Sequence, residues 1–376
     1  MADVETKERV FSVAAVRAQA LAILRAWGME DADAEVTADV MIDADLRGIE
    51  SHGTSLLAFY ARFKPGQLNF KARPKLEKDG PSFALIDADA ALGFAVSAFA
   101  MGRAVEKAKA TGVALVLVRN SHHFGPAGYY ARMAADAGLV GMVMCTTKIV
   151  TLVPTFGAEP VLGTNPIAFG IPTGEPGTGN EPIVFDMATS TVAGNKVRVY
   201  HLKDKPLPQG WVVDGQGQPI TDPHTGYEYV FERKEGGLTP VGGTPDLSSY
   251  KGYGLALMVQ FLSGSMAGAA FPPMKAKTDA ARAPGTIVPD NIGHFFMAMA
   301  PAVFRAFGDF TAEVREIADT LRAARPADPR QPVILPGDKE RAMRLHRLAH
   351  GIPLPTMLLT QLKDIAHAAG APFHLT

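Results

Sequence analysis

Residues 113–129 read VALVLVRNSHHFGPAGY, and this stretch decides the fold class. The apolar run from Val113 to Val118 is typical of a buried strand, because it is short, continuous and rich in valine. Gly125 follows, and Pro126 suits the first turn of a helix. A buried strand that leads through a glycine-bearing turn into a helix predicts an α/β or mixed α+β fold.

The same alternation continues on both sides of this stretch. Short apolar runs predict strands at 83–86, 139–144, 167–171, 183–185 and 295–299, and helical patterns fall at 94–110 and 127–137. Near the N-terminus we expect one helix ending at Gly28 and a second from Asp31 to about Leu46. The tail becomes helical again after Pro336-Gly337.

These patterns predict two domains. Residues 1–80 and 330–376 are expected to form a helical domain from both chain ends, and residues 81–329 a central sheet domain. Within the latter, residues 201–250 are rich in Gly, Pro and Asp and indicate a loop-rich small subdomain. The uncharged segment 252–274 is long enough to span a bilayer, but its glycines and prolines favour a helix buried in a large core.

Composition narrows the classes of function. The chain has 376 residues with 37 basic and 38 acidic side chains. This balance argues against nucleic-acid or membrane-surface partners, and we expect a small molecule as the substrate. Cys145 is the single cysteine, so we expect no internal disulfide, no thiolate metal cluster and a cytoplasmic location. The motif H-E-x-x-H is missing, and no metal is predicted.

Three predicted helix starts carry glycine, at 125–128, at Lys251-Gly252 and at 337–339. Free backbone N–H groups and the helix dipole at such starts suit phosphates, so the set indicates a dinucleotide. Each has a plainer interpretation: an ordinary turn at 125–128, a solvated flank at Lys251, and an N-cap at Asp338. G-x-G-x-x-G is missing, so a standard Rossmann site is not predicted.

Two histidine sites and one carboxylate are candidates for proton transfer. His52 lies between Ser51 and Gly53 after the second helix, and imidazole suits proton transfer at neutral pH. His123 follows the strand at 113–118, and Asp186 closes another strand, where a carboxylate can orient a histidine or bind a ribose. A capping histidine and a strand-ending aspartate are equally compatible with these patterns.

Together, the segments 47–53, 123–129, 163–166, 186–190, 251–255, 293–296 and 336–337 resemble, in the same order, the malate/L-lactate dehydrogenase family of the second, non-Rossmann type. The resemblance covers nearly the whole chain. It implies an NAD- or NADP-dependent oxidoreductase with a non-Rossmann nucleotide-binding sheet domain, a helical domain built from both termini, and a homodimeric assembly.

The resemblance also implies roles for individual residues. His52, Ser51, His123 and Asp186 match the catalytic positions, and Arg47, Lys148 and Asn165 are candidates for the substrate site. The cofactor-binding positions that it implies are His123, Phe124, Gly125, Thr147, Asp186, Met187, Ala188, Lys251, Gly252, Gly337, Asp338 and Lys339. Many relatives carry an arginine for the substrate carboxylate where this chain has Leu56. Either another cation holds the carboxylate, with Lys148 our first candidate ahead of Arg47 and Lys196, or the substrate is less acidic.

We therefore expect transfer of hydride between the nicotinamide and C2 of a small 2-oxo or 2-hydroxy acid, with His52 or His123 as the acid–base group. Reduction of a cyclic imine carboxylate is an alternative within the family. A hydrolase built on Ser51, His52 and Asp186 is less expected, because adjacent Ser and His side chains rarely face each other and the chain has no nucleophile elbow. A non-catalytic small-molecule binding protein is a further alternative.

Overall fold

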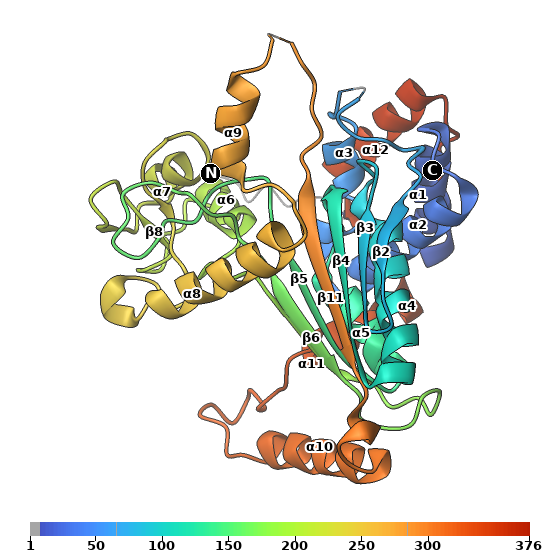
Figure 1. Ribbon diagram of the computed structural model, residues 1–376. Helices are drawn as coiled ribbons and strands as arrows, with labels where there is room; N and C mark the ends of the chain where they lie inside the picture. Colours follow the sequence, from blue (N-terminus) through green and yellow to red (C-terminus); the bar gives the residue numbers. More distant parts are fainter. Residues whose placement is uncertain (1–7, 65, 284) are drawn as a thin grey trace.

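The computed structural model describes residues 8–64, 66–283 and 285–376, and a seven-stranded mixed sheet lies at its centre (Figure 1). Its strands are β2 (Lys75–Asp79), β3 (Phe83–Asp87), β4 (Val113–Ser121), β5 (Val140–Cys145), β6 (Ile167–Ile171), β7 (Ile183–Met187) and β11 (Ile292–Met299). Their order in the sheet is β2-β3-β4-β11-β5-β6-β7. β3 and β4 run parallel and the other neighbours run antiparallel. The predicted strands and the mixed α/β fold class are confirmed.

Two helices cover one face of this sheet. α4 (Gly93–Thr111) makes the crossover that the parallel β3–β4 pair requires, and α5 (Ala127–Asp136) packs against β5 and β6. Gly141 and Gly170 allow this close packing, because a Cβ on either would collide with the backbone carbonyl of Ala131 in α5. The start of α5 is thereby fixed beside the ends of β6 and β7.

The uncharged segment covers the opposite face, as α8 (Tyr250–Val259) and a π-helical stretch, η3 (Gln260–Ser265). Val259 packs with Met144 and Phe295 of the sheet, but Phe261 is 58% exposed. The prediction of an enclosed helix is therefore wrong for its outer face, because a lack of charge does not specify which side is covered. No helix within the described residues is long and apolar enough to cross a membrane.

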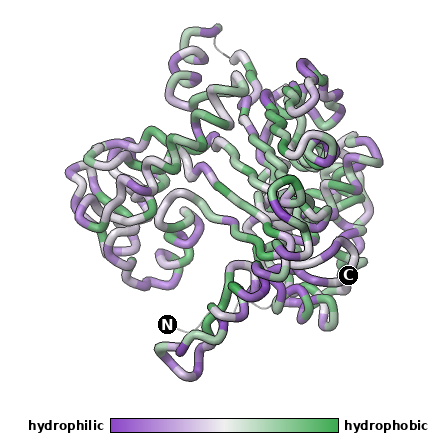
Figure 2. The backbone as a smooth tube through the Cα atoms, turned by 60° about the horizontal axis from the view of Figure 1, so that its bottom comes forward, coloured by the Kyte–Doolittle hydropathy of each residue, from purple (hydrophilic) through white to green (hydrophobic). Residues whose placement is uncertain are grey.

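Helices from both chain ends pack together, and α2 (Asp31–Leu46) joins them to α4. They are α1 (Val13–Ala26), α2, α3 (Leu56–Tyr60), α11 (Asp338–His350) and α12 (Thr356–Ala369), and β1 (Glu8–Phe11) pairs with β12 (Ile352–Pro355). The buried side chain of Gln19 in α1 joins the two ends, since its amide bonds the carbonyl of Pro372 and the N–H of His374. Figure 2 shows hydrophobic residues concentrated where these helices and the sheet meet.

A smaller unit inserted after β7 has its own core. It contains α6 (Gly194–Leu202), α7 (Pro223–Phe231) and the short strands β8 (Val212–Val213), β9 (Pro219–Ile220) and β10 (Gly237–Leu238) around Val197, Leu207 and Leu238. α9 (Pro272–Ala280) and α10 (Phe307–Arg322) complete the long helices, and single 3-10 turns occur at η1 (Glu50–His52), η2 (Pro245–Leu247) and η4 (Pro301–Val303). α10 lies apart from the sheet at the bottom of Figure 1.

Candidate active site

A large cleft runs between the sheet and the helices of the chain ends. Its walls come from the α2–α3 segment, the start of α5, β7, and residues 334–341 at the start of α11. The cavity volume is about 1320 Å³, whereas pockets for single small ligands have roughly 300–1,000 Å³. The cleft therefore has room for a ligand larger than one small metabolite.

Two histidines lie side by side in this cleft. His52 is in η1, and its ring stacks on that of His123 with the centroids 5.4 Å apart. Ser51 Oγ lies 2.8 Å from Nδ1 of His52. The Tyr60 hydroxyl lies 2.7 Å from Nδ1 of His123, and the N–H of Gly125 donates to the same nitrogen at 3.3 Å.

These contacts determine which nitrogen each ring presents to a ligand. A backbone N–H can only donate, so Nδ1 of His123 accepts and the neutral ring carries its proton on Nε2. Nδ1 of His52 is engaged by Ser51. Neither Nε2 has a hydrogen-bond partner in the described part of the chain, so both are available to a substrate oxygen.

Both imidazoles are neutral at pH 7. Burial lowers the pKa of His52 to about 4. Burial, with repulsion from His52 and His294, lowers the pKa of His123 to about 3. A neutral imidazole can accept a proton at the ring nitrogen that carries no hydrogen, which is the task of a general base.

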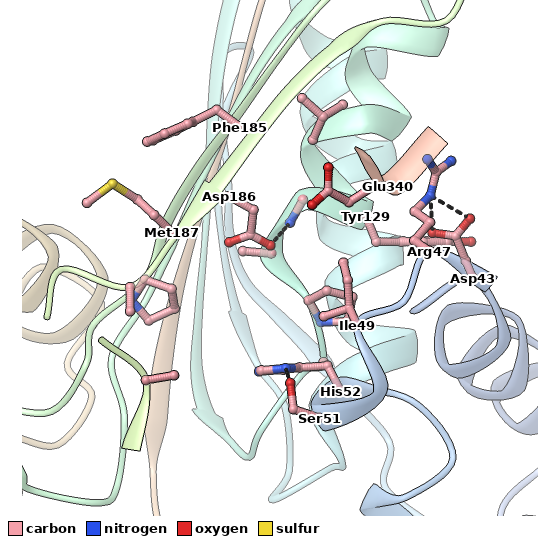
Figure 3. Close-up of a pocket in the computed structure, with 18 of the residues that line it drawn as sticks. Asp43, Arg47, Ile49, Ser51, His52, Tyr129, Phe185, Asp186, Met187 and Glu340 are labelled. Carbon is pink, nitrogen blue, oxygen red and sulfur yellow. Dashed lines mark hydrogen bonds and ion pairs between the residues drawn. The ribbon is translucent and has the colours of Figure 1, made fainter. Parts of the chain in front are cut away.

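Ser51 and His52 do face each other, so our argument against a hydrolase, that such neighbours rarely do, is wrong for this pair (Figure 3). In a hydrolytic triad a carboxylate would orient the histidine. Asp186 does not do so: its Oδ2 accepts a hydrogen bond of 2.7 Å from the N–H of Gly128. The expected orientation of an imidazole by Asp186 is therefore also wrong, and Tyr60 contacts His123 instead.

The position of Asp186 also contradicts the expectation that the start of α5 binds a phosphate. Its carboxylate binds the N-terminus of α5, where we expected a phosphate, so a second anion there would be repelled. Asp186 faces the cleft opposite Ser51 and His52 (Figure 3). Burial by the cleft walls raises its pKa to about 6, and the Glu340 carboxylate adds to this effect.

Arg47 lines the cleft but is already paired. Its Nε lies 2.9 Å from Oδ2 of Asp43 (Figure 3). Arg132 binds the same carboxylate at 3.0 Å. The Arg47 side chain is only 9% exposed. Arg47 is therefore poorly placed to hold a substrate carboxylate by itself.

Lys148 lies in the cleft within a second group of charges. Its Nζ is 2.8 Å from Oδ1 of Asp290, whose Oδ2 is 3.1 Å from Nδ1 of His122. Burial tends to raise the pKa of Asp290, but the hydrogen bonds from His122 and Lys148 outweigh it and hold that pKa below the ordinary value. Lys196, the other candidate cation, lies over the ring of Trp211.

The remaining predicted residues divide into two groups. The cleft lining includes Phe124, Gly125, Thr147, Met187, Ala188, Gly337, Asp338 and Lys339. It does not include Asn165, Lys251 or Gly252. Asn165 is fully buried and its amide donates to the carbonyl of Ala256, so the prediction that it binds substrate is wrong.

The α8 start is also away from the cleft. Lys251 is exposed, and Gly252 packs so closely on Val241 that any side chain would collide with that backbone. This close packing explains the glycine without a ligand. At the third start, Gly337 is the N-cap with φ of 92°. Asp338 follows it, pairs with Arg322, and is not the N-cap that the plainer interpretation assigned to it.

Sequence reasoning missed Tyr60 and Asp290, and it assigned no role to His122. Tyr60 lies on α3, 63 positions from His123, and Asp290 precedes β11, 168 positions from His122. No motif indicated them. Knowledge of the strand order would have pointed to Asp290, because β11 lies between β4 and β5.

Known proteins resemble this chain along nearly its whole length. The family model for malate/L-lactate dehydrogenase matches residues 11–363. The chain is 38% identical to a malate dehydrogenase of Pyrococcus abyssi over 93% of this chain and 91% of that protein. It is 32% identical to an NAD(+) ureidoglycolate dehydrogenase of Escherichia coli O157:H7, with 87% of each covered. The crystal structure of a malate dehydrogenase from Entamoeba histolytica superimposes with a TM-score of 0.88 at 30% identity, covering 97% and 99% of the two chains.

Proposed function

The chain belongs to the malate/L-lactate dehydrogenase family, and on this premise we propose that it interconverts a small 2-oxo acid and its 2-hydroxy acid with NAD or NADP as hydride carrier. The observation that carries the proposal is the stacked pair His52 and His123, which lies in one cleft with Asp186 and the start of α11. The proton donor or acceptor and the groups suited to a nucleotide therefore share one cavity.

The residues of the cleft fit a dinucleotide. The Asp186 carboxylate can accept from ribose hydroxyls, a frequent use of acidic residues in nucleotide sites. Gly337, with its positive φ, lies close to the backbone of Val184, and Lys339 follows in the first turn of α11. We propose that these residues hold the cofactor, with Phe124 and Gly125 beside the reacting end.

We propose that Nε2 of His52 moves the proton, with the hydrogen of the neutral ring on Nδ1, toward Ser51 Oγ. In the direction of oxidation a neutral ring accepts the proton of the 2-hydroxyl group, and in the direction of reduction the protonated ring returns it. His52 is our first candidate, with Ser51 on its Nδ1. His123, held by Tyr60, is the second candidate, and its hydrogen would have to move from Nε2 to Nδ1 before Nε2 could accept a proton. General acid–base catalysis typically contributes about 10²–10⁴-fold.

The first experiment is a titration with NADH and NADPH, followed by fluorescence, together with an assay of 2-oxo acids with both cofactors. We expect binding of at least one cofactor and its oxidation by a small 2-oxo acid. If neither cofactor binds, the proposal fails. Cyclic imine carboxylates belong in the same panel, and faster turnover of an imine than of any 2-oxo acid would identify an imine reductase instead.

The second experiment separates the two histidines. His52→Ala is expected to lose most turnover and to keep its affinity for NADH, since the ring is removed from proton transfer and the nucleotide contacts remain. His123→Ala, assayed beside it, is the matched comparison. Near-normal turnover of His52→Ala with a loss in His123→Ala would assign the acid–base role to His123.

We also propose that two copies of the chain associate, as the resemblance implies. Large apolar side chains remain uncovered on α10 and α11, among them Ile317, Leu321 and Leu345. Exposed apolar surface of this kind is typical of contacts between subunits. Light scattering after size-exclusion chromatography is expected to give the mass of a dimer, and the mass of a monomer at micromolar concentration would contradict this.

A further inference from the structure

We propose that Lys148, Asp290 and His122 form one anion subsite, which holds the substrate carboxylate next to the reacting carbon in place of the arginine absent at Leu56. This inference rests on the proposed function, because it assigns the carboxylate of a 2-oxo acid to a place in the same cleft. Asp290 acts as a positioning residue, since it contacts both cationic side chains.

The strand order brings the three residues together. β11 is paired on one side with β4 and on the other with β5, both antiparallel. Cys145 of β5 is opposite His294, and Ser121 of β4 is opposite Ile292. The chain that leaves β5 therefore passes Asp290 on one side, and the chain that leaves β4 passes it on the other.

The hydrogen bonds indicate that His122 carries two protons. Its Nε2 lies 2.7 Å from the carbonyl oxygen of Gln67, and its Nδ1 lies 3.1 Å from the Asp290 carboxylate. A carbonyl and an ionised carboxylate can only accept, so both ring nitrogens bond fully only when each has a hydrogen. A neutral ring would leave one of these two acceptors without a hydrogen bond. The side chains of His122 and Asp290 are 1% and 6% exposed, so water has little access to replace that bond.

The group then has a net charge of plus one. Lys148 and the His122 imidazolium each contribute one positive charge, and Asp290 contributes one negative charge. The Lys148 side chain is 47% exposed and is the member that reaches the cleft. Its ammonium has three donors, of which one bonds Asp290, so the others can bind a carboxylate.

This group lies beside the imidazole pair. The Phe63 ring packs edge-on against His122 and lies under the ammonium of Lys148, 5.4 Å from its centroid. Tyr60 lies between Phe63 and His123. A carboxylate on Lys148 would therefore lie in the same cleft as the imidazole pair.

The cleft lining also includes arginines, among them Arg47, Arg62 and Arg132, and Arg132 shares the Asp43 carboxylate with Arg47. Arg47 is paired with Asp43 and largely buried, as described above. Arg62 is exposed and forms no ion pair within the described residues, so it is the competing cation. The experiment must distinguish Arg62 from Lys148.

The test uses charge rescue, with KM and kcat measured for pyruvate. Lys148→Met and His122→Asn each bring the net charge to zero, and each is expected to raise KM about ten- to hundredfold, the range for a hydrogen bond to a charged group. Asp290→Asn keeps the net charge at plus one if His122 becomes neutral, so its KM is expected to change little. The double variant His122→Asn with Asp290→Asn is expected to regain most of the affinity that His122→Asn loses.

The controls identify what is recognised. KM for the neutral analogue pyruvamide is expected to stay constant in Lys148→Met. Lys109→Met, which changes an exposed lysine in the last turn of α4, is the surface control. The inference is wrong if the double variant is worse than His122→Asn alone. It is also wrong if Arg62→Gln, rather than Lys148→Met, raises KM for pyruvate, or if the variants affect only the second carboxylate of oxaloacetate.

A measurement without turnover separates this inference from the proposed function. In ¹⁵N NMR spectra at pH 7, His122 is expected to have hydrogens on both ring nitrogens, and pyruvate is expected to shift its signals. A neutral ring with hydrogen only on Nε2 would overturn the subsite. If the protein reduces no 2-oxo acid but pyruvate still shifts the His122 signals, the proposed function fails and the subsite stands.

Discussion

The Tyr60 hydroxyl and Nδ1 of His123 lie 2.7 Å apart, although 63 positions separate the two residues in the chain. Tyr60 ends α3, and its side chain is fully enclosed. Burial raises the pKa of this phenol well above its ordinary value, so the hydroxyl keeps its hydrogen. α3 therefore fixes the direction in which the imidazole presents its other nitrogen to the cleft.

Tyr60→Phe is expected to lower kcat by up to about tenfold, because a neutral hydrogen bond contributes about 0.5–1.5 kcal/mol. The phenyl ring fills the same space, so the free energy of unfolding should change little. Tyr130→Phe is a matched control, since its buried hydroxyl bonds the carbonyl of Phe124 and not an imidazole. Equal kcat values for the wild type and Tyr60→Phe would show that His123 needs no such support.

The low pKa values of the two histidines predict the acid limb of the pH profile for oxidation. A general base must be unprotonated, and these rings take up a proton only near pH 4 and pH 3. Therefore kcat/KM for the 2-hydroxy acid should stay level as the pH falls from 7 to 5. A decline centred near pH 6.5, the usual value for histidine, would contradict the burial of both rings.

The elements of the fold could be predicted because each leaves a local signal. The run 113–118 and Pro126 identify a strand and a helix wherever they lie in space, and both are found as β4 and α5. The outer face of η3 could not be predicted in the same way, because Phe261 is as apolar as its buried neighbours. Exposure of an apolar residue depends on what the rest of the chain covers.

The part of the site that could be predicted is the part whose functional residues are neighbours in the chain. Ser51 and His52 are adjacent in the chain and lie together in the cleft. Asp290 is close to Lys148 only through the strand order, and Asp186 is directed to Gly128 by the packing of α5 on the sheet. Pairings of this kind depend on long-range topology, which single-residue patterns do not contain.

Asp186→Asn tests the proposed ribose contact. An amide oxygen can still accept from the N–H of Gly128, so the start of α5 should keep its structure. The loss of a charged acceptor is expected to weaken NADH binding about tenfold or more. In the wild type the affinity should also fall as the pH drops through about 6, where this carboxylate takes up a proton, and the variant should lack that step. Calorimetry at pH 5 and pH 8 measures both effects, and identical affinities in the two proteins would remove Asp186 from the nucleotide site.

Asp45→Asn tests whether the buried carboxylate of Asp45, near the end of α2, lowers the free energy of unfolding at neutral pH. The Asp45 carboxylate is 2% exposed and accepts from the N–H and hydroxyl of Thr54 at 3.0 and 2.7 Å. Burial raises its pKa from 3.8 to about 6, so the folded protein binds this proton more tightly than the unfolded chain does. Stability from this group therefore falls as the pH rises from about 4 to about 6, by roughly 3 kcal/mol at 1.36 kcal/mol per pKa unit.

An amide at this position can accept both hydrogen bonds from Thr54 without a charge. Compared with the wild type, Asp45→Asn should therefore gain stability between pH 4 and pH 7, as measured by urea unfolding at both values. Asp45→Ala, which leaves the Thr54 donors without their acceptor, should be less stable than either protein at both pH values. A constant difference between the wild type and Asp45→Asn across this range would mean that Asp45 ionises as an ordinary aspartate despite its burial.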